Sequence, residues 1–229
     1  MFPALIFASV LAFAGTGPDQ DAKPADGKGA ASICEQAPSE CRMVPTFSLR
    51  IGDKAFPVTF DKPQPWIMEG RLYIFPGESV VLVLKPDGGI RVTSSQPAEA
   101  VIDDAVAAKM IAVFAPGGSG ENATEADVIP GTTDLRQDAP SQAIRVSFRQ
   151  AAHSDQMVLA VQNGYGGRLA YDAGMLTPSG DGGVWRETSV CTLRPDLYGM
   201  EHWPHAIVSL SLGAFTIDRT APADEIICR

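Results

Sequence analysis

The sequence predicts an all-β fold, an antiparallel β-sandwich of immunoglobulin-like or jelly-roll-like architecture with at most one short helix. The first observation is that short runs of alternating apolar and polar residues follow one another along most of the chain, separated by turns rich in Gly and Pro. The second is that no alternation of strands with helices indicates a parallel sheet. The chain has 229 residues, 45% of them hydrophobic, which is enough to bury a core.

The first predicted strands form a hairpin. Apolar residues alternate with polar ones over 47–51 and again over 56–60, and Gly52, Asp53 and Lys54 between them form the expected turn. Pro57 has no N–H to donate to a neighbouring strand, which favours a place at a sheet edge. Turns at Pro76–Glu78 and Pro86–Gly89 separate the next predicted strands, 71–75, 79–84 and 90–93.

Residues 97–109 are the segment with helical periodicity, because Pro97 suits a first turn and Val101, Ile102, Ala105 and Ala108 can share one face. We expect a strand at 110–114. Residues 116–140 have no periodicity, so they are expected to form a long loop, or a boundary between two halves, 34–115 and 141–229. Either way, 34–229 is the predicted β-sandwich region.

In the second half, alternating runs predict strands at 144–148, 157–161, 168–171, 184–191 and 207–212. Residues 141–229 have about the length of one immunoglobulin-like sandwich but lack its Cys…Trp…Cys spacing, so the prediction concerns architecture only. Between the last two strands, 198–205 is expected to be a corner at which Trp203 packs and Pro204 precedes the final strand.

Residues 1–14 are apolar and uncharged and end in Ala12-Phe13-Ala14, the pattern that signal peptidases cut. We therefore expect a secretory signal peptide, with a buried helix or strand as the alternative. The run is too short to span a bilayer. Residues 15–33, rich in Gly, Ala, Pro, Asp and Lys, are expected to be a flexible linker. These features predict a secreted or periplasmic protein without a transmembrane segment, and the excess of Arg over Lys suggests a bacterial envelope.

The four cysteines, Cys34, Cys41, Cys191 and Cys228, are expected to form disulfides in an oxidising compartment. Three connectivities are possible, and the spacing favours Cys34–Cys41 and Cys191–Cys228. The chain-entropy model gives roughly 2.5 kcal/mol for the shorter loop and roughly 4 kcal/mol for the longer one. Zinc binding would require Cys-x-x-Cys or Cys/His spacings that the sequence lacks.

Charge and motifs exclude several classes of function. The net charge is −9, and no cluster of Lys and Arg is present, which argues against binding to nucleic acid or anionic membrane. Gly117–Glu121 lacks the final glycine of the serine-hydrolase motif G-x-S-x-G. The acidic pairs Asp103/Asp104 and Asp181/Glu187 are expected to be solvated surface groups. No catalytic residue and no cofactor are predicted.

Two groups of residues are candidate sites. Met200, His202 and His205 combine thioether and imidazole ligands, a set suited to copper, but Pro204 and the spacing separate the two rings unless the chain turns sharply. We therefore expect no tight metal site. Aromatic side chains can form a ligand platform, for example for a glycan. The candidates, otherwise needed in the core, are Trp66, Trp185 and Trp203, with Tyr165 and Tyr171.

The sequence thus predicts an exported, disulfide-stabilised β-sandwich that acts as a non-catalytic binding or structural module, with an envelope protein or a glycan as the partner. Two alternatives remain open. One is a copper-handling protein that uses Met200, His202 and His205, and the other is an envelope hydrolase whose catalytic residues the sequence does not identify.

Overall fold

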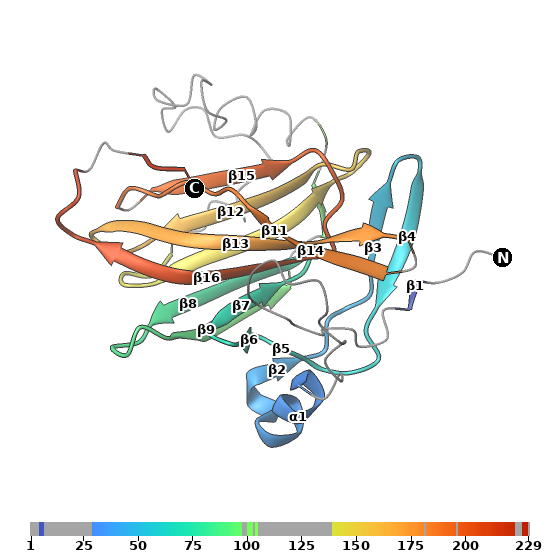
Figure 1. The fold of residues 1–229 in the computed structure, drawn as a ribbon, viewed down its shortest axis with the longest axis horizontal. Coiled ribbons are helices and arrows are strands. Elements are labelled where there is room, and N and C mark those ends of the chain that lie inside the picture. Colours follow the sequence, from blue (N-terminus) through green and yellow to red (C-terminus); the bar gives the residue numbers. More distant parts are fainter. Residues whose placement is uncertain are drawn as a thin grey trace, which may run out of the picture.

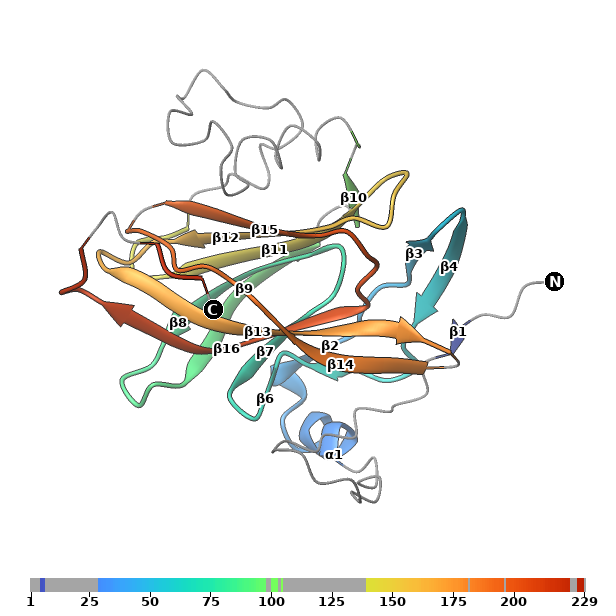
Figure 2. The ribbon, with the colours of Figure 1, turned by 45° about the horizontal axis from the view of Figure 1, so that its top comes forward.

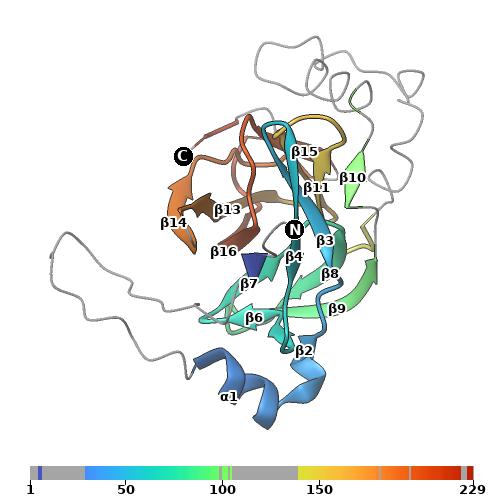
Figure 3. The ribbon, with the colours of Figure 1, turned by 90° about the vertical axis from the view of Figure 1, so that its right-hand side faces the viewer.

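The structure, a computed structural model, describes residues 5–6, 29–97, 100–102, 104, 139–180, 182–195, 197–222 and 226–228. It confirms the predicted fold class. Two antiparallel sheets face each other, and Figure 3 shows them end-on, with sheet II on the left and sheet I on the right. No helix in these described ranges is long and apolar enough to cross a membrane.

Sheet I has the strand order β15-β12-β11-β8-β9, and β10 pairs in parallel with the end of β11. Its strands are β8 (Glu78–Leu84), β9 (Ile90–Pro97), β10 (Val101–Ile102), β11 (Ile144–Ala151), β12 (Met157–Asn163) and β15 (Tyr198–Trp203). Sheet II has the order β14-β13-β16-β7-β6 (Figures 1 and 2). Its strands are β6 (Ile67–Met68), β7 (Arg71–Ile74), β13 (Arg168–Ser179), β14 (Gly182–Thr188) and β16 (Ser209–Asp218).

Alternation along the strands produces the core. Every second residue of the central strands points between the sheets and is fully buried, because successive side chains of a strand face opposite sides. Sheet I contributes Val80, Leu82, Ile144, Val146, Phe148, Leu159 and Val161, and sheet II contributes Leu72, Ile74, Leu169, Leu210 and Leu212. Both sheets combine strands from before and after residues 116–140, so the two halves of the chain share this core.

A hairpin closes one end of the sandwich (Figure 3). Its strands are β3 (Phe47–Ile51) and β4 (Lys54–Thr59), joined by a two-residue turn in which Gly52 has φ 58°; Lys54, which was expected in the turn, is the first residue of β4. Leu49 and Val58 face the core and are buried. On the outer edge of β3, backbone groups form hydrogen bonds with a side chain instead of a strand. The Gln150 side-chain amide accepts the Arg50 N–H at 2.7 Å and donates to the Arg50 carbonyl at 2.9 Å.

The N-terminal part of the chain differs from expectation. Residues 5–6, inside the predicted signal peptide, form strand β1 (Leu5–Ile6), which pairs in parallel with Val58 and Thr59 of β4. Helix α1 (Gly29–Gln36) takes up the last five residues of the predicted linker. The rest of the predicted signal peptide and linker lies outside the described residues.

The Cys34–Cys41 disulfide ties α1 to η1 (Pro38–Glu40) and β2 (Cys41–Arg42), and β2 pairs with β5 (Gln64–Pro65). The second disulfide joins Cys191 to Cys228. Both disulfides have the connectivity that the cysteine spacing favours.

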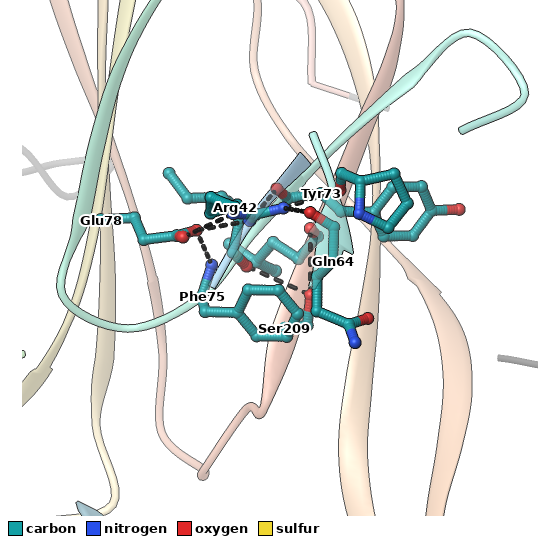
Figure 4. A network of polar contacts seen from close by, with 9 residues as sticks. Arg42, Gln64, Tyr73, Phe75, Glu78 and Ser209 are labelled. Atoms are coloured by element: carbon teal, nitrogen blue, oxygen red, sulfur yellow. Dashed lines mark hydrogen bonds and ion pairs between the residues drawn. The ribbon is translucent and has the colours of Figure 1, made fainter. Parts of the chain in front are cut away.

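A buried network joins this N-terminal segment to the sandwich (Figure 4). Arg42 of β2 donates two hydrogen bonds, of 2.8 and 2.7 Å, to the carboxylate of Glu78 in β8. It also donates to the backbone carbonyls of Gln64, Pro65 and Tyr73. The exposed fractions of the two side chains are 11% for Arg42 and 8% for Glu78. One guanidinium therefore links β2 and β5 to both sheets.

Two predictions were wrong. The expected helix over 97–109 does not begin at Pro97, because Pro97 ends β9 and Val101–Ile102 form β10; Asp104 is helical, and the residues after it up to 109 lie outside the described ranges. Residues 198–203 form a strand, β15, which pairs with β12, so only 204–205 make the expected corner. The runs at 71–75 and 79–84 form strands β7 and β8, which lie in different sheets. The expected strand at 110–114 and most of the loop 116–140 lie outside the described residues.

Candidate functional site

The three tryptophans do not form one platform. Trp203 points into the core from β15, is 7% exposed, and donates its Nε1–H to the Thr188 hydroxyl at 2.7 Å. Trp66 stacks on the Arg42 guanidinium, 3.9 Å from the ring centroid. Only Trp185 lies on an outer face of the sandwich, on the edge strand β14 of sheet II.

The outer face of sheet II has an unusual construction. The two central strands, β13 and β16, carry small residues there, namely Gly174, Ser209, Ser211 and Gly213. Long side chains from the flanking positions extend across these small residues. Tyr73 of β7 and Trp185 of β14 meet as an edge-to-face pair with 5.8 Å between ring centroids, although β16 and β13 lie between their strands.

An ion pair lies beside the two rings. Arg71 of β7 crosses β16 and meets Asp172 of β13 with 2.7 Å between Nη1 and Oδ1. The guanidinium also donates to the backbone carbonyl of Ser211 at 3.2 Å. We refer to Arg71, Tyr73, Asp172 and Trp185 as the sheet II platform. It combines the partly exposed Trp185 ring, against which the buried Tyr73 packs, with a donor and an acceptor on the outer face of one sheet.

Two glycines make this packing possible. A Cβ atom at Gly213 would lie 2.8 Å from Nη1 of Arg71, and a Cβ at Gly174 would lie 2.8 Å from the Ser211 hydroxyl. Both distances are too short for side chains to remain where they are. Glycine at 213 therefore allows Arg71 to cross the sheet, and glycine at 174 leaves room for the Ser211 hydroxyl between the two strands.

The ionisation states of the platform favour hydrogen bonding. Burial raises the pKa of the Tyr73 hydroxyl to about 12, an effect that the nearby Arg71 charge partly opposes. The phenol is therefore neutral at physiological pH. Asp172 and Arg71 are partly exposed, with side-chain exposed fractions of 55% and 30%. Their outward hydrogen-bonding atoms can thus reach a bound molecule.

The proposed copper ligands are not gathered at one point. Met200 and His202 lie on the outer face of β15, since they pair with Ala160 and Val158 of β12. His205 follows the end of the strand, and its Nε2 lies 3.4 Å from the Sδ atom of Met175. Across the described ranges, no group of three or more His, Cys, Asp and Glu side chains is placed to hold a metal ion. The copper hypothesis stays untested.

The sequence reasoning missed a partly buried acid. Glu201 shares the inner face of β15 with Trp203, opposite Leu159. One carboxylate oxygen accepts the Cys191 N–H at 2.8 Å. Burial raises the pKa of Glu201, and the Cys191 hydrogen bond partly opposes this. Period-two alternation through 198–203 would have placed Glu201 inside, had this segment been predicted as a strand.

Two tyrosines considered as platform residues are buried. Tyr165 is 7% exposed and its hydroxyl accepts the Leu84 N–H at 2.9 Å, so it has a structural role. Tyr171 is also 7% exposed and stacks on Phe215 at 5.8 Å. Tyr73 is 3% exposed and lies on the face opposite the core, as its alternation with Leu72 and Ile74 indicates, so it supports Trp185 from beside rather than offering its own ring to a ligand.

Comparison with known proteins gives no relative, since no family model, no curated protein and no solved structure matches the chain. We therefore infer its function from its own residues.

Proposed function

We propose that the protein is exported and acts outside the cytoplasm as a non-catalytic module that binds a glycan on the sheet II platform. The observation that supports this proposal most directly is that the partly exposed Trp185 ring, held edge-to-face by the buried Tyr73, lies on the same outer face as the Arg71–Asp172 ion pair. A flat aromatic face attracts the C–H groups of a sugar ring, and aromatic rings combine large contact area with fixed geometry.

The polar half of the platform suits the hydroxyl groups of the same sugar. A guanidinium offers several N–H donors in a fixed fork, and a carboxylate accepts through two oxygens. Because Arg71 and Asp172 are already paired at 2.7 Å, donor and acceptor lie at the spacing of neighbouring hydroxyl groups. Adjacent hydroxyls both donate and accept, so they can engage both side chains together.

A protein partner is less well supported. Specific protein interfaces usually have a buried apolar centre with aromatic anchors. The large apolar side chains that are exposed in the described part of the chain are Met43, Val184, Leu197 and Ile226, which come from separate segments. Only Val184 lies on sheet II, and it is on the face of β14 opposite to Trp185.

Export is supported by the two disulfides and by the apolar residues at the start of the chain. Disulfides form and persist in oxidising compartments and are rare in the cytosol. N-terminal sequencing of protein recovered from the medium or the periplasm tests this part of the proposal. We expect a chain that begins at Gly15, and recovery of soluble protein that retains Met1 would contradict it.

Binding is tested by affinity electrophoresis through gels that contain neutral and acidic polysaccharides, together with sedimentation on insoluble glycans and peptidoglycan. We expect the protein to be retarded or bound by at least one of them. Replacement Trp185→Ala should weaken that binding at least tenfold, since stacking on the ring is lost. Val184→Ser, on the opposite face of the same strand, is the matched control and should bind as the unmodified protein does.

Two results would reject the glycan proposal. One is that the unmodified protein binds none of the glycans. The other is that Trp185→Ala binds as tightly as Val184→Ser, which would place any glycan site elsewhere on the molecule.

A further inference from the structure

A second polar site lies inside the sandwich, around Tyr171, and is independent of the sheet II platform. Strands β13 and β16 change register between Ala170 and Asp172. At this point Ala214 and Phe215 of β16 face the single residue Tyr171, and Ala214 has φ 49°. This is a β-bulge with a non-glycine residue in the left-handed region, an arrangement that is strained and redirects side chains.

The bulge places the Tyr171 phenol between the sheets, where it stacks on Phe215 with an interplanar angle of 17°. The Tyr171 hydroxyl oxygen is buried, and none of the residues that the structure describes forms a hydrogen bond with it. Nearly all buried polar groups in proteins have a partner, and one without it calls for a physical explanation. Burial raises the pKa of Tyr171 well above its ordinary value, so this hydroxyl is an O–H donor at physiological pH.

Leu193 pairs with Leu169 of β13, so the segment that contains Cys191 runs alongside Tyr171. Glu201 of the facing sheet reaches this segment, and its charge raises the pKa of Tyr171 further. Its Oε1 accepts the Cys191 N–H. A carboxylate has room for several hydrogen bonds, so the group can accept at least one more. Tyr171 is therefore a buried donor for which the described residues provide no acceptor, and Glu201 is a partly buried acceptor that can form a further hydrogen bond.

We propose that Tyr171 and Glu201 form an internal binding site for one small molecule of hydroxyl chemistry, either a single water or a short alcohol. A hydroxyl oxygen accepts the Tyr171 O–H, and its own O–H donates to the Glu201 carboxylate. A water molecule in such a position makes two to four hydrogen bonds, as buried waters do. A pure acceptor or a pure donor would satisfy only one of the two side chains.

The test compares crystal structures of the unmodified protein, Tyr171→Phe and Tyr165→Phe. The control is matched, because Tyr165 is equally buried but its hydroxyl already accepts the Leu84 N–H. We expect density for an ordered oxygen within hydrogen-bond distance of both Tyr171 and Glu201 in the unmodified protein and in Tyr165→Phe. Tyr171→Phe should lack it.

Crystals grown with and without methanol or ethylene glycol show whether the bound molecule is a water or a short alcohol. A single atom in every crystal identifies water, and elongated density that appears only with the additive identifies an alcohol site. Absence of any density in the unmodified protein would overturn the proposal, as would a direct hydrogen bond between Tyr171 and Glu201.

Nuclear magnetic resonance provides a test in solution with selectively labelled glutamate. The bridging molecule stabilises the charged carboxylate, so its loss in Tyr171→Phe should raise the pKa of Glu201 by about half a pH unit or more. Tyr165→Phe should leave this pKa unchanged. An unchanged or lowered pKa of Glu201 in Tyr171→Phe would contradict the proposed bridge. Thermal unfolding of both variants checks that the fold is kept.

Discussion

Replacing Arg42 by methionine should be among the most destabilising single changes at a polar residue. Arg42 and Glu78 are almost completely withdrawn from water, with side chains 11% and 8% exposed. Methionine keeps much of the length of the side chain but removes both of the hydrogen bonds that Arg42 donates to the Glu78 carboxylate. The remaining partner of that carboxylate is the Phe75 N–H, at 2.8 Å. Removing one partner of a buried ion pair typically costs about 3–5 kcal/mol, because the other charge stays buried.

Four further losses act in the same direction. The carbonyls of Gln64, Pro65 and Tyr73 lose a charged donor, and the guanidinium no longer stacks on the ring of Trp66. We therefore expect the free energy of unfolding to fall by at least about 3 kcal/mol. Urea unfolding followed by far-ultraviolet circular dichroism measures this loss, and an unchanged m-value shows that the unfolded state is the same.

An exposed ion pair is the control. Arg71 and Asp172 are also 2.7 Å apart but are 30% and 55% exposed, so Asp172→Asn should cost less than about 1 kcal/mol. The double variant Arg42→Met/Glu78→Gln removes the stranded charge while keeping an acceptor for the Phe75 N–H. It should be more stable than Arg42→Met alone by roughly 1–3 kcal/mol. Two results would contradict this reasoning. One is that Arg42→Met lowers the free energy of unfolding no more than Asp172→Asn does. The other is that the effects of Arg42→Met and Glu78→Gln simply add in the double variant, since burial of the Arg42–Glu78 pair would then not explain its contribution to stability.

Other predictions concern the second disulfide, the buried acid and one close contact. Cys228→Ser should lower the free energy of unfolding by about 2–5 kcal/mol, measured by urea unfolding, and by more than Cys41→Ser, because its loop is longer. Since the folded-state pKa of Glu201 is raised, its contribution to stability is complete below the ordinary carboxyl pKa and is lost as the pH rises through the raised pKa. Thermal melts across the acidic range should therefore decline less steeply with rising pH for Glu201→Gln, and equal slopes would contradict this. Gly199→Ala should cost about 1–3 kcal/mol or more in the same urea assay, because its Cβ would overlap with Leu193, and wild-type stability would show that Leu193 can move aside.

Period-two alternation was a sufficient basis for most of the fold. It located the 47–59 hairpin and the strands around Ile144, Met157 and Leu210, because burial of one or both sheet faces leaves a strong local pattern. Alternation did not predict the strand at 198–203, because its inner face carries Gly199, Glu201 and Trp203, of which only Trp203 is large and apolar. A strand with a buried carboxyl on its inner face does not look like a strand in sequence.

The sheet II platform could not be predicted from sequence for another reason. Its side chains come from strands that are far apart in the chain, so their proximity depends on strand order, which local patterns do not encode. Trp185 was a candidate on residue type alone. Its meeting with Tyr73 requires two intervening strands with small residues at the matching positions, Ser211 and Gly174.

The position of β16 also determines when the fold can be completed. Within the described part of sheet II, β7 and β13 do not pair with each other, and β16 joins them. Its Leu210 pairs with Ile74, 136 residues earlier (210 minus 74), so chain elongation must deliver residues 209–218 before the two parts of the sheet can meet. Such distant pairing makes folding slow and leaves strand edges open to aggregation meanwhile. A nascent chain that has not yet emerged as far as Ser209 is therefore the form most in need of a chaperone.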